Sequence, residues 1–190
     1  ERIGSIGINA NLDLRDGAVS TVQKGAGGAQ GTDQIQNLFA MVDFGAQIIT
    51  TRGDDTITLV MTVDENRDFF SINNEGGADT VTVTPARDTL TLEIGSGNRD
   101  VFADLAANDI RTLDGNASFD VTFTTDPASA ELRYDIRTRN GNDQSFGTDY
   151  DNRFVLQSGN DFADGCAGFD TIGYNSSTYT SGTNTYFLCS

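Results

Sequence analysis

A glycine-bearing turn followed by an aspartate recurs along this 190-residue chain at intervals that vary little. The aspartates that follow such turns are Asp33, Asp55, Asp79, Asp100, Asp120, Asp143 and Asp161. Consecutive members lie about 20 residues apart, a period typical of one repeated supersecondary unit. Repetition therefore constrains the fold more than any other feature of the sequence.

A second, weaker set of turns lies between the members of the first. Its polar residues are Asp43, Asp68, Asp88, Asp109, Glu131, Asn152 and Asp170. Each of them follows a member of the first set by roughly half a period. The repeated unit is therefore expected to hold two short strands and two turns.

Apolar and polar residues alternate after most of these acids, as in TITLV at 56–60 and TVTV at 80–83. Alternation places side chains such as Ile57, Leu59 and Val81 on one face of a strand. Short strands that bury only one face gain stability by stacking on neighbours. The sequence thus predicts an all-β fold, a parallel β-roll or β-solenoid of about 7 coils with about 21 residues each and few or no helices.

The whole chain, 1–190, is expected to form one such domain. Residues 1–32 would supply an N-terminal strand and spacer, 33–170 the repeats, and 171–190 a last coil closed by a disulfide. The apolar positions of 101–113 also fit a short helix, which is the only stretch where helical spacing competes with alternation.

The charge of the chain limits its partners. There are 28 acids against 12 bases, a formal net charge of −16, so a nucleic-acid backbone would be repelled. Apolar runs are far shorter than the roughly 20 residues of a membrane span. With no histidine and a single lysine, nucleophile–base pairs are missing, and we expect no enzyme. Paired carboxylates, as in glycoside hydrolysis, remain the one catalytic alternative.

The two cysteines, Cys166 and Cys189, are separated by close to the length of one coil. This spacing suggests a disulfide between neighbouring strands; a disulfide in an irregular terminal loop is the alternative. A disulfide implies an oxidising compartment. Together with a chain that begins at Glu1 without methionine, it leads us to expect a secreted, extracellular protein.

Several segments resemble a known repeat. GGADTVTV at 76–83, NGND at 140–143, SGND at 158–161 and GNDFADGCAGFDTIGY at 159–174 are similar to the nonapeptide G-G-x-G-x-D-x-U-x of the RTX, or haemolysin-type, calcium-binding β-roll. The separation of Asp161 and Asp170 equals one nonapeptide, which is the family spacing. Elsewhere the half-units are longer and many lack the double glycine.

The resemblance implies Ca²⁺ held between adjacent turns by glycine carbonyls and aspartate carboxylates. The residues that match this role are Asp33, Gly53, Asp55, Gly76, Gly77, Asp79, Asp100, Asp120, Gly141, Asp143, Gly159, Asp161, Gly168 and Asp170. Electrostatics favours the same cation, because stacked coils would place like-charged acids close together and a cation between them would relieve the repulsion. Ca²⁺ also accepts oxygen ligands in irregular geometry. In the competing interpretation, aspartate and glycine simply form good turns.

We therefore expect a secreted calcium-binding structural protein. Alternation begins at Ile6 and the chain ends in TYFLCS, so neither end offers a polar cap, and open strand edges pair with other chains. Head-to-tail copies would build an extracellular filament, matrix or surface layer, with extracellular polysaccharide as a further possible partner. The alternative is a calcium-dependent folding or secretion module of a larger RTX adhesin or enzyme.

Overall fold

The computed structural model describes residues 8–13, 19–24, 32–36, 46–61, 69–87, 89–128, 130–174 and 185–187, and these are all-β with no helix. The stretch 101–113 forms strands and not the competing helix. No helix that could cross a membrane occurs in these ranges.

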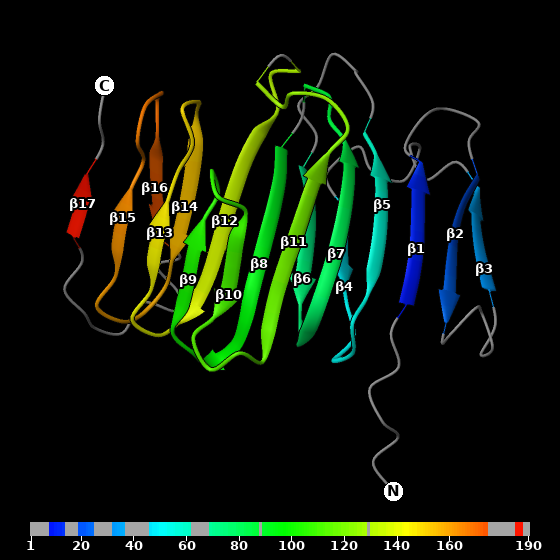
Figure 1. Ribbon diagram of the computed structural model, residues 1–190, viewed down its shortest axis with the longest axis horizontal. Coiled ribbons are helices and arrows are strands. Elements are labelled where there is room, and N and C mark those ends of the chain that lie inside the picture. The colour runs from blue at the N-terminus through cyan, green and yellow to red at the C-terminus, as the bar shows by residue number, and fades with distance from the viewer. Residues whose placement is uncertain are drawn as a thin grey trace, which may run out of the picture.

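Two sheets make up the fold, and Figure 1 shows them lying face to face. Sheet A runs in the order β17 (Thr185–Phe187), β15 (Phe162–Asp164), β13 (Gln144–Phe146), β9 (Val101–Asp104), β10 (Asp109–Thr112), β11 (Ala117–Phe123), β7 (Gly77–Thr84), β5 (Thr56–Val60), β1 (Ile8–Asp13), β2 (Val19–Lys24) and β3 (Thr32–Gln36). Sheet B runs in the order β16 (Thr171–Tyr174), β14 (Asn152–Leu156), β12 (Arg133–Asn140), β8 (Thr89–Asn98), β6 (Phe69–Asn74) and β4 (Ala46–Ile49).

Successive strands enter opposite sheets from β4 to β8 and again from β12 to β17 (Figure 1). Because the chain returns to a sheet only after crossing the other, neighbouring strands there pair in parallel. Thr56 pairs with Thr80, and Gln144 pairs with Phe162. These offsets equal the separations of the glycine–aspartate turns in the same two parts of the chain.

The sheets also hold antiparallel pairs, which an all-parallel roll does not have. β1, β2 and β3 pair antiparallel in series, and so do β9, β10 and β11. The second series has local causes. Asn108 turns the chain between β9 and β10 with a φ of 55°, and Gly115, after Asp114, does so between β10 and β11 with a φ of 72°. The expectation of purely parallel sheets is corrected at these two places.

The core lies between the sheets and consists of apolar rows that run across the strands. In sheet B one row in register contains Ile48, Ile72, Leu92, Ile136, Phe154 and Ile172. In sheet A, Ile57, Val81 and Val121 form a facing row, and Ile57 and Val81 are fully buried. The inward face predicted by alternation in β5 and β7 is confirmed. The end members Ile48 and Ile172 are only partly buried.

Glycine is required where one turn of the chain lies directly against the equivalent turn one repeat earlier. Gly77 has a φ of 88°, and a Cβ there would lie 2.5 Å from the carbonyl oxygen of Gly53. Gly159 has a φ of 146°, and its Cβ would overlap the carbonyl oxygen of Gly141. Both positions therefore exclude a side chain through steric overlap as well as through backbone conformation.

This contact can be tested by substitution. We expect Gly159→Ala to lower the free energy of unfolding by about 3 kcal/mol or more, because backbone strain adds to the overlap with Gly141. Gly115→Ala is the matched control, since its φ is also positive but its Cβ would meet no atom within 4 Å. The control should cost about 1 kcal/mol. Urea unfolding of both variants measures the difference, and equal losses would contradict the role given to the corner contact.

Candidate functional site

Side chains at the corners bond to the backbone of the adjoining coil. At the corner that leads into sheet A, the Asp55 N–H donates to Asp79 Oδ1 at 3.1 Å. In the same way the Val101 N–H donates to Asp143 Oδ1 at 2.9 Å, and the Asp143 N–H to Asp161 Oδ1 at 3.1 Å. We call these residues the inner row. Each carboxylate satisfies a buried donor of the preceding coil.

A second set of bonds, the outer row, lies one residue earlier in the chain and runs in the opposite direction. Asp54 Oδ1 accepts the N–H of Ala78 at 2.9 Å. Asp100 Oδ1 accepts the N–H of Asn142 at 2.8 Å, and Asn142 Oδ1 accepts that of Asn160 at 3.1 Å. Each of these side chains is bonded to the following coil. The two rows therefore fasten a corner such as 142–143 to both of its neighbours.

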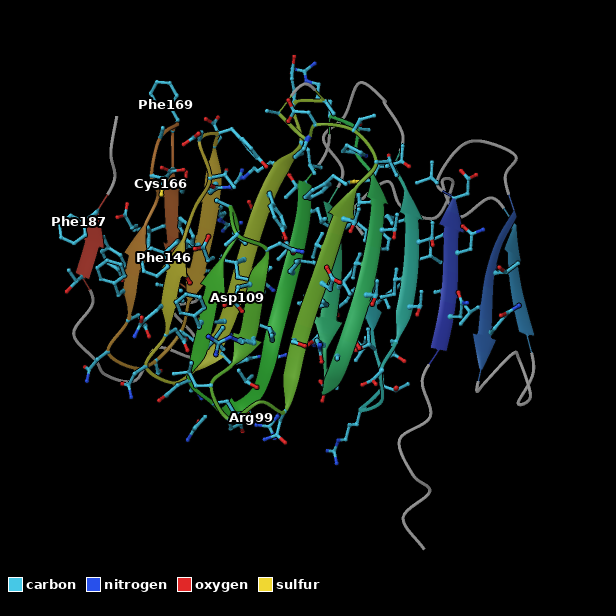
Figure 2. All side chains as sticks on the ribbon, viewed as in Figure 1. Arg99, Asp109, Phe146, Cys166, Phe169 and Phe187 are labelled. Carbon is cyan, nitrogen blue, oxygen red and sulfur yellow. The ribbon has the colours of Figure 1, made fainter. Side chains whose placement is uncertain are left out.

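The corner that leads into sheet B repeats this arrangement once. The Asn152 N–H donates to Asp170 Oδ1 at 2.9 Å, and the Phe169 N–H donates to Asp151 Oδ1 at 2.9 Å. Figure 2 labels Phe169 at this end of the strands and Arg99, next to the inner and outer rows, at the other. The glycine–aspartate turns thus lie at both ends of the strands.

Two acids of the inner row are buried with one oxygen left over. Asp79 and Asp143 are each 1% exposed, and their Oδ2 atoms make no hydrogen bond of good geometry. Burial raises the pKa of Asp79 from 3.8 to about 7, against the opposing backbone hydrogen bond from Asp55. Burial likewise raises the pKa of Asp143 to about 7. The nearby side chains of Thr50 and Thr138 nevertheless act to lower the pKa of Asp79 and of Asp143, respectively. Burial also raises the pKa of Asp161 and of Asp170.

The structure brings together part of the predicted set. Asp55, Asp79, Asp143 and Asp161 lie in the inner row, each two residues after a glycine of the predicted set: Gly53, Gly77, Gly141 and Gly159. Gly168 precedes Asp170 in the same way, and Gly76 donates its N–H to Asn74 Oδ1 at 2.6 Å. Asp100 lies in the outer row.

Two predicted acids lie elsewhere. Asp120 is in the middle of β11, where its carboxylate accepts from the Asn108 side chain at 3.0 Å. The antiparallel strands β9–β11 lie where the next repeat would have continued. They separate the inner row into one part that contains Asp55 and Asp79 and another that contains Val101, Asp143 and Asp161. Asp33 belongs to β3, and its side chain lies outside the described residues.

Apart from Asp100, sequence reasoning missed the residues of the outer row and its counterpart at sheet B. Asp54, Asn142 and Asp151 each stand between a turn and the acid or amide that starts the strand. The available signal is the short polar residue directly before the repeated acid, as in the second position of G-D-D and G-N-D. Such residues also favour turns for purely local reasons, so the pattern alone does not reveal a bond to the next coil.

Oxygen atoms at the corner offer a partial fit to a hard cation. Two kinds of oxygen occur in these turns: the Oδ2 atoms of Asp79 and Asp143, and the backbone carbonyls of Gly53 and Gly141, which face the following repeat. Carboxylate and carbonyl oxygens are the ligands that Ca²⁺ prefers. In the ranges described, no three acid or cysteine side chains converge as a ready metal cluster. A cation at this corner would therefore depend on carbonyls as much as on carboxylates.

The predicted disulfide stays a prediction. Cys166 is a half-buried thiol at the turn after β15, with a φ of 63°. Cys189 lies outside the described residues.

Comparison of the chain with protein-family models, with curated proteins and with solved structures found no match. What the protein does must therefore be inferred from its own residues.

The buried carboxyls predict a pH dependence. Because the pKa of Asp79 and Asp143 is raised in the folded state, the folded chain binds more protons than the unfolded one. In chelator, stability should therefore fall as the pH rises from about 4 to about 7, by about 1 kcal/mol per pH unit for each carboxyl. Urea unfolding across this range measures the slope.

The double variant Asp79→Asn, Asp143→Asn should reduce that slope, because the amide keeps Oδ1 as an acceptor and carries no titrating proton. A smaller slope should remain, because burial also raises the pKa of Asp135, Asp161 and Asp170. Asp54→Asn, an exposed position of the outer row, is the matched control and should leave the slope in place. An unchanged slope in the double variant would rule out these two carboxyls as its source.

Proposed function

We propose that this chain is a structural β-solenoid whose corner aspartates bind Ca²⁺ and which joins other copies end to end in an extracellular assembly. The observation that carries the proposal is the pair of corner rows. Strands enter opposite sheets in turn, and corner residues recur at offsets of 18 to 24 outside the β9–β11 insertion. These features support a winding of about 7 coils of about 21 residues. The acids here hold the backbone in register, which favours a structural role over catalysis.

Calcium is proposed because two buried acids of the corner are incompletely satisfied. Asp79 and Asp143 each have a buried carboxylate oxygen without a partner. At neutral pH such a group either keeps a proton or takes up a cation. A proton satisfies one oxygen of one coil, whereas a divalent ion can bridge two adjacent coils through carboxylate and carbonyl oxygens. The second outcome stabilises the register on which the fold depends.

End-to-end assembly is proposed because the last described strands leave the core only partly covered. Ile172 of β16 and Tyr186 of β17 pack on the core but are only partly buried. On the outer side of sheet A, the Phe162 ring packs against the tilted Phe187 ring with their centroids 5.7 Å apart, and Phe187 remains 53% exposed (Figure 2). Edge strands with unpaired backbone groups and apolar side chains favour addition of another chain.

Titration with Ca²⁺ tests both parts of the proposal. In chelator at pH 7.5 we expect reduced strand content by circular dichroism and a low urea midpoint. Millimolar Ca²⁺ should raise the midpoint and, by sedimentation velocity, produce species larger than one chain. Chelator should reverse both changes. Folding without assembly would instead support the alternative, a calcium-dependent folding module of a larger protein. No change with Ca²⁺ would overturn the calcium proposal.

The proposed end contact has its own test. We expect Phe187→Lys to abolish assembly while changing the free energy of unfolding by less than about 1 kcal/mol, because charge on an edge strand opposes pairing. Phe169→Lys is the matched control, since Phe169 is 88% exposed but lies in a turn. If both variants assemble like the parent, the β17 edge is not the contact.

A further inference from the structure

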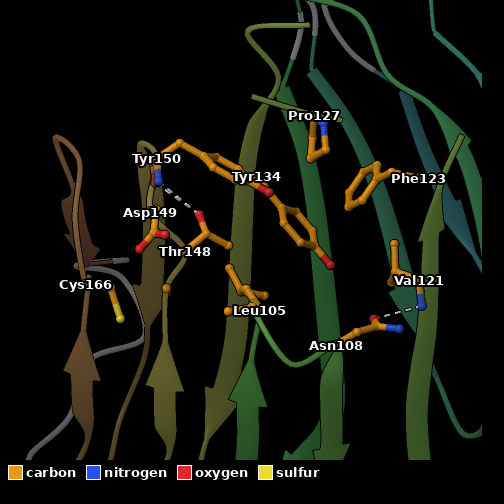
Figure 3. A pocket seen from close by; sticks show the side chains of 12 residues that line it. Leu105, Asn108, Val121, Phe123, Pro127, Tyr134, Thr148, Asp149, Tyr150 and Cys166 are labelled. Atoms are coloured by element: carbon orange, nitrogen blue, oxygen red, sulfur yellow. Dashed lines mark hydrogen bonds between the residues drawn. The ribbon is translucent and has the colours of Figure 1, made fainter. Parts of the chain in front are cut away.

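A cavity of about 380 Å³ opens where the antiparallel insertion interrupts sheet A. Its wall is formed by the residues that follow β9, β13 and β15, by the end of β11 and by the start of β12. Figure 3 shows the Tyr134 ring reaching in between Tyr150 and Phe123, with Pro127 above and Leu105 below. This volume is large enough for a small organic group.

The wall of the cavity is rich in aromatic rings. Phe123 and Tyr134 meet edge to face, with their centroids 5.3 Å apart, and Tyr150 lies at the mouth and is half-buried. Aromatic faces carry negative electrostatic potential and attract cations within about 6 Å. The rings therefore offer both apolar contact and a preference for positive charge.

Carboxylates surround the same space. Asp149 lines it, and Asp126 lies close enough to Tyr150 to raise the pKa of that hydroxyl, after the larger effect of burial. Asp164, Asp149 and Asp104 act in the same direction on the pKa of the Cys166 thiol, again after burial. No lysine or arginine is among the lining residues in the described part of the chain. Arg133, which lines the adjoining depression with Tyr150, is bound to Asp135 at 3.0 Å.

Tyr134 also brings one polar group to the wall of the cavity. Tyr134 is 2% exposed and lines the cavity. The backbone carbonyl of Tyr134 is bound by Asn152, but among the described residues its hydroxyl makes no hydrogen bond. A ligand with a polar group would satisfy it.

We propose that this cavity binds a compact organic cation, a methylated ammonium or an amine, through the rings of Tyr134, Tyr150 and Phe123 and the carboxylate of Asp149. The neutral phenol oxygen of Tyr134 accepts a hydrogen bond from an N–H or hydroxyl of the ligand. The site is distinct from the inner and outer rows and from the end contact, so it goes beyond the structural role. Its residues Thr148 and Tyr150 adjoin the corner that leads into sheet B.

Binding of choline, compared with that of its neutral isostere 3,3-dimethylbutan-1-ol, tests the proposal by calorimetry on the full chain. The two probes share shape and hydroxyl group and differ in charge. Choline should bind at least about tenfold more tightly than the alcohol under conditions in which circular dichroism shows the chain folded. Equal affinities would show a merely apolar cavity and overturn the proposal. Absence of choline binding up to about 50 mM by folded protein would overturn it as well.

Variants locate the site. Tyr150→Ala should weaken choline binding about tenfold, whereas Tyr150→Phe keeps the ring and should bind like the parent. Asp149→Asn should weaken it about threefold, and Asp109→Asn, an exposed acid paired with Arg111 on the outer face of sheet A, should have no effect. Circular dichroism confirms folding of each variant. Binding that survives Tyr150→Ala unchanged would place the cation elsewhere and refute the assignment.

Discussion

The hydrogen bond from a corner side chain to the backbone of the adjoining coil is the contact on which the rest of the structure depends. At each corner the chain leaves one sheet before it enters the other, so the regular backbone pairing stops and side chains supply the acceptors. The backbone donors of the inner row are buried, and those of the outer row are exposed. Asp79 and Asp143 supply acceptors to the preceding coil, and Asp54 and Asn142 supply them to the following one. The strands then start in register, and their apolar rows meet.

A buried carboxylate at such a corner has a desolvation cost, which the amide of Asn152 avoids. Asn152 stands where its Nδ2 donates to the Tyr134 carbonyl at 3.1 Å while its Oδ1 accepts from Thr148, so that both side-chain atoms are used. Asp79 and Asp143 occupy corresponding corner positions as acids, with one buried oxygen unused. An amide would meet the structural need at lower cost. The choice of carboxylates there favours a role for the charge itself.

Much of the fold follows from local patterns, and the parts that did not follow have identifiable causes. Alternation in β5 and β7 predicts the buried face because period-two spacing has one physical interpretation in a strand. The spacing of Asp55, Asp79, Asp143 and Asp161 predicts the inner row, since residues that follow equivalent turns occupy equivalent positions in neighbouring repeats. Asp120 also fits that spacing, yet the turns at Asn108 and Gly115 reverse the chain and take it out of the row. Position in a repeat cannot reveal such a reversal, because it depends on turn geometry. The cavity around Tyr134 could not be predicted from the sequence for a related reason, because its walls come from segments distant in sequence.

The same offset, 18 positions along the chain, holds at both ends of the strands in the last coils, from Asn142 to Asn160 and from Asp151 to Phe169. A segment of that length carries its own strands, its own glycine corners and the polar groups that fasten it to either neighbour. Tandem duplication of one such segment would lengthen the protein without requiring compensating changes elsewhere, since the new unit meets the same surfaces as the old one. Gain of one such 18-residue segment is therefore sterically simple, and loss of one is equally so.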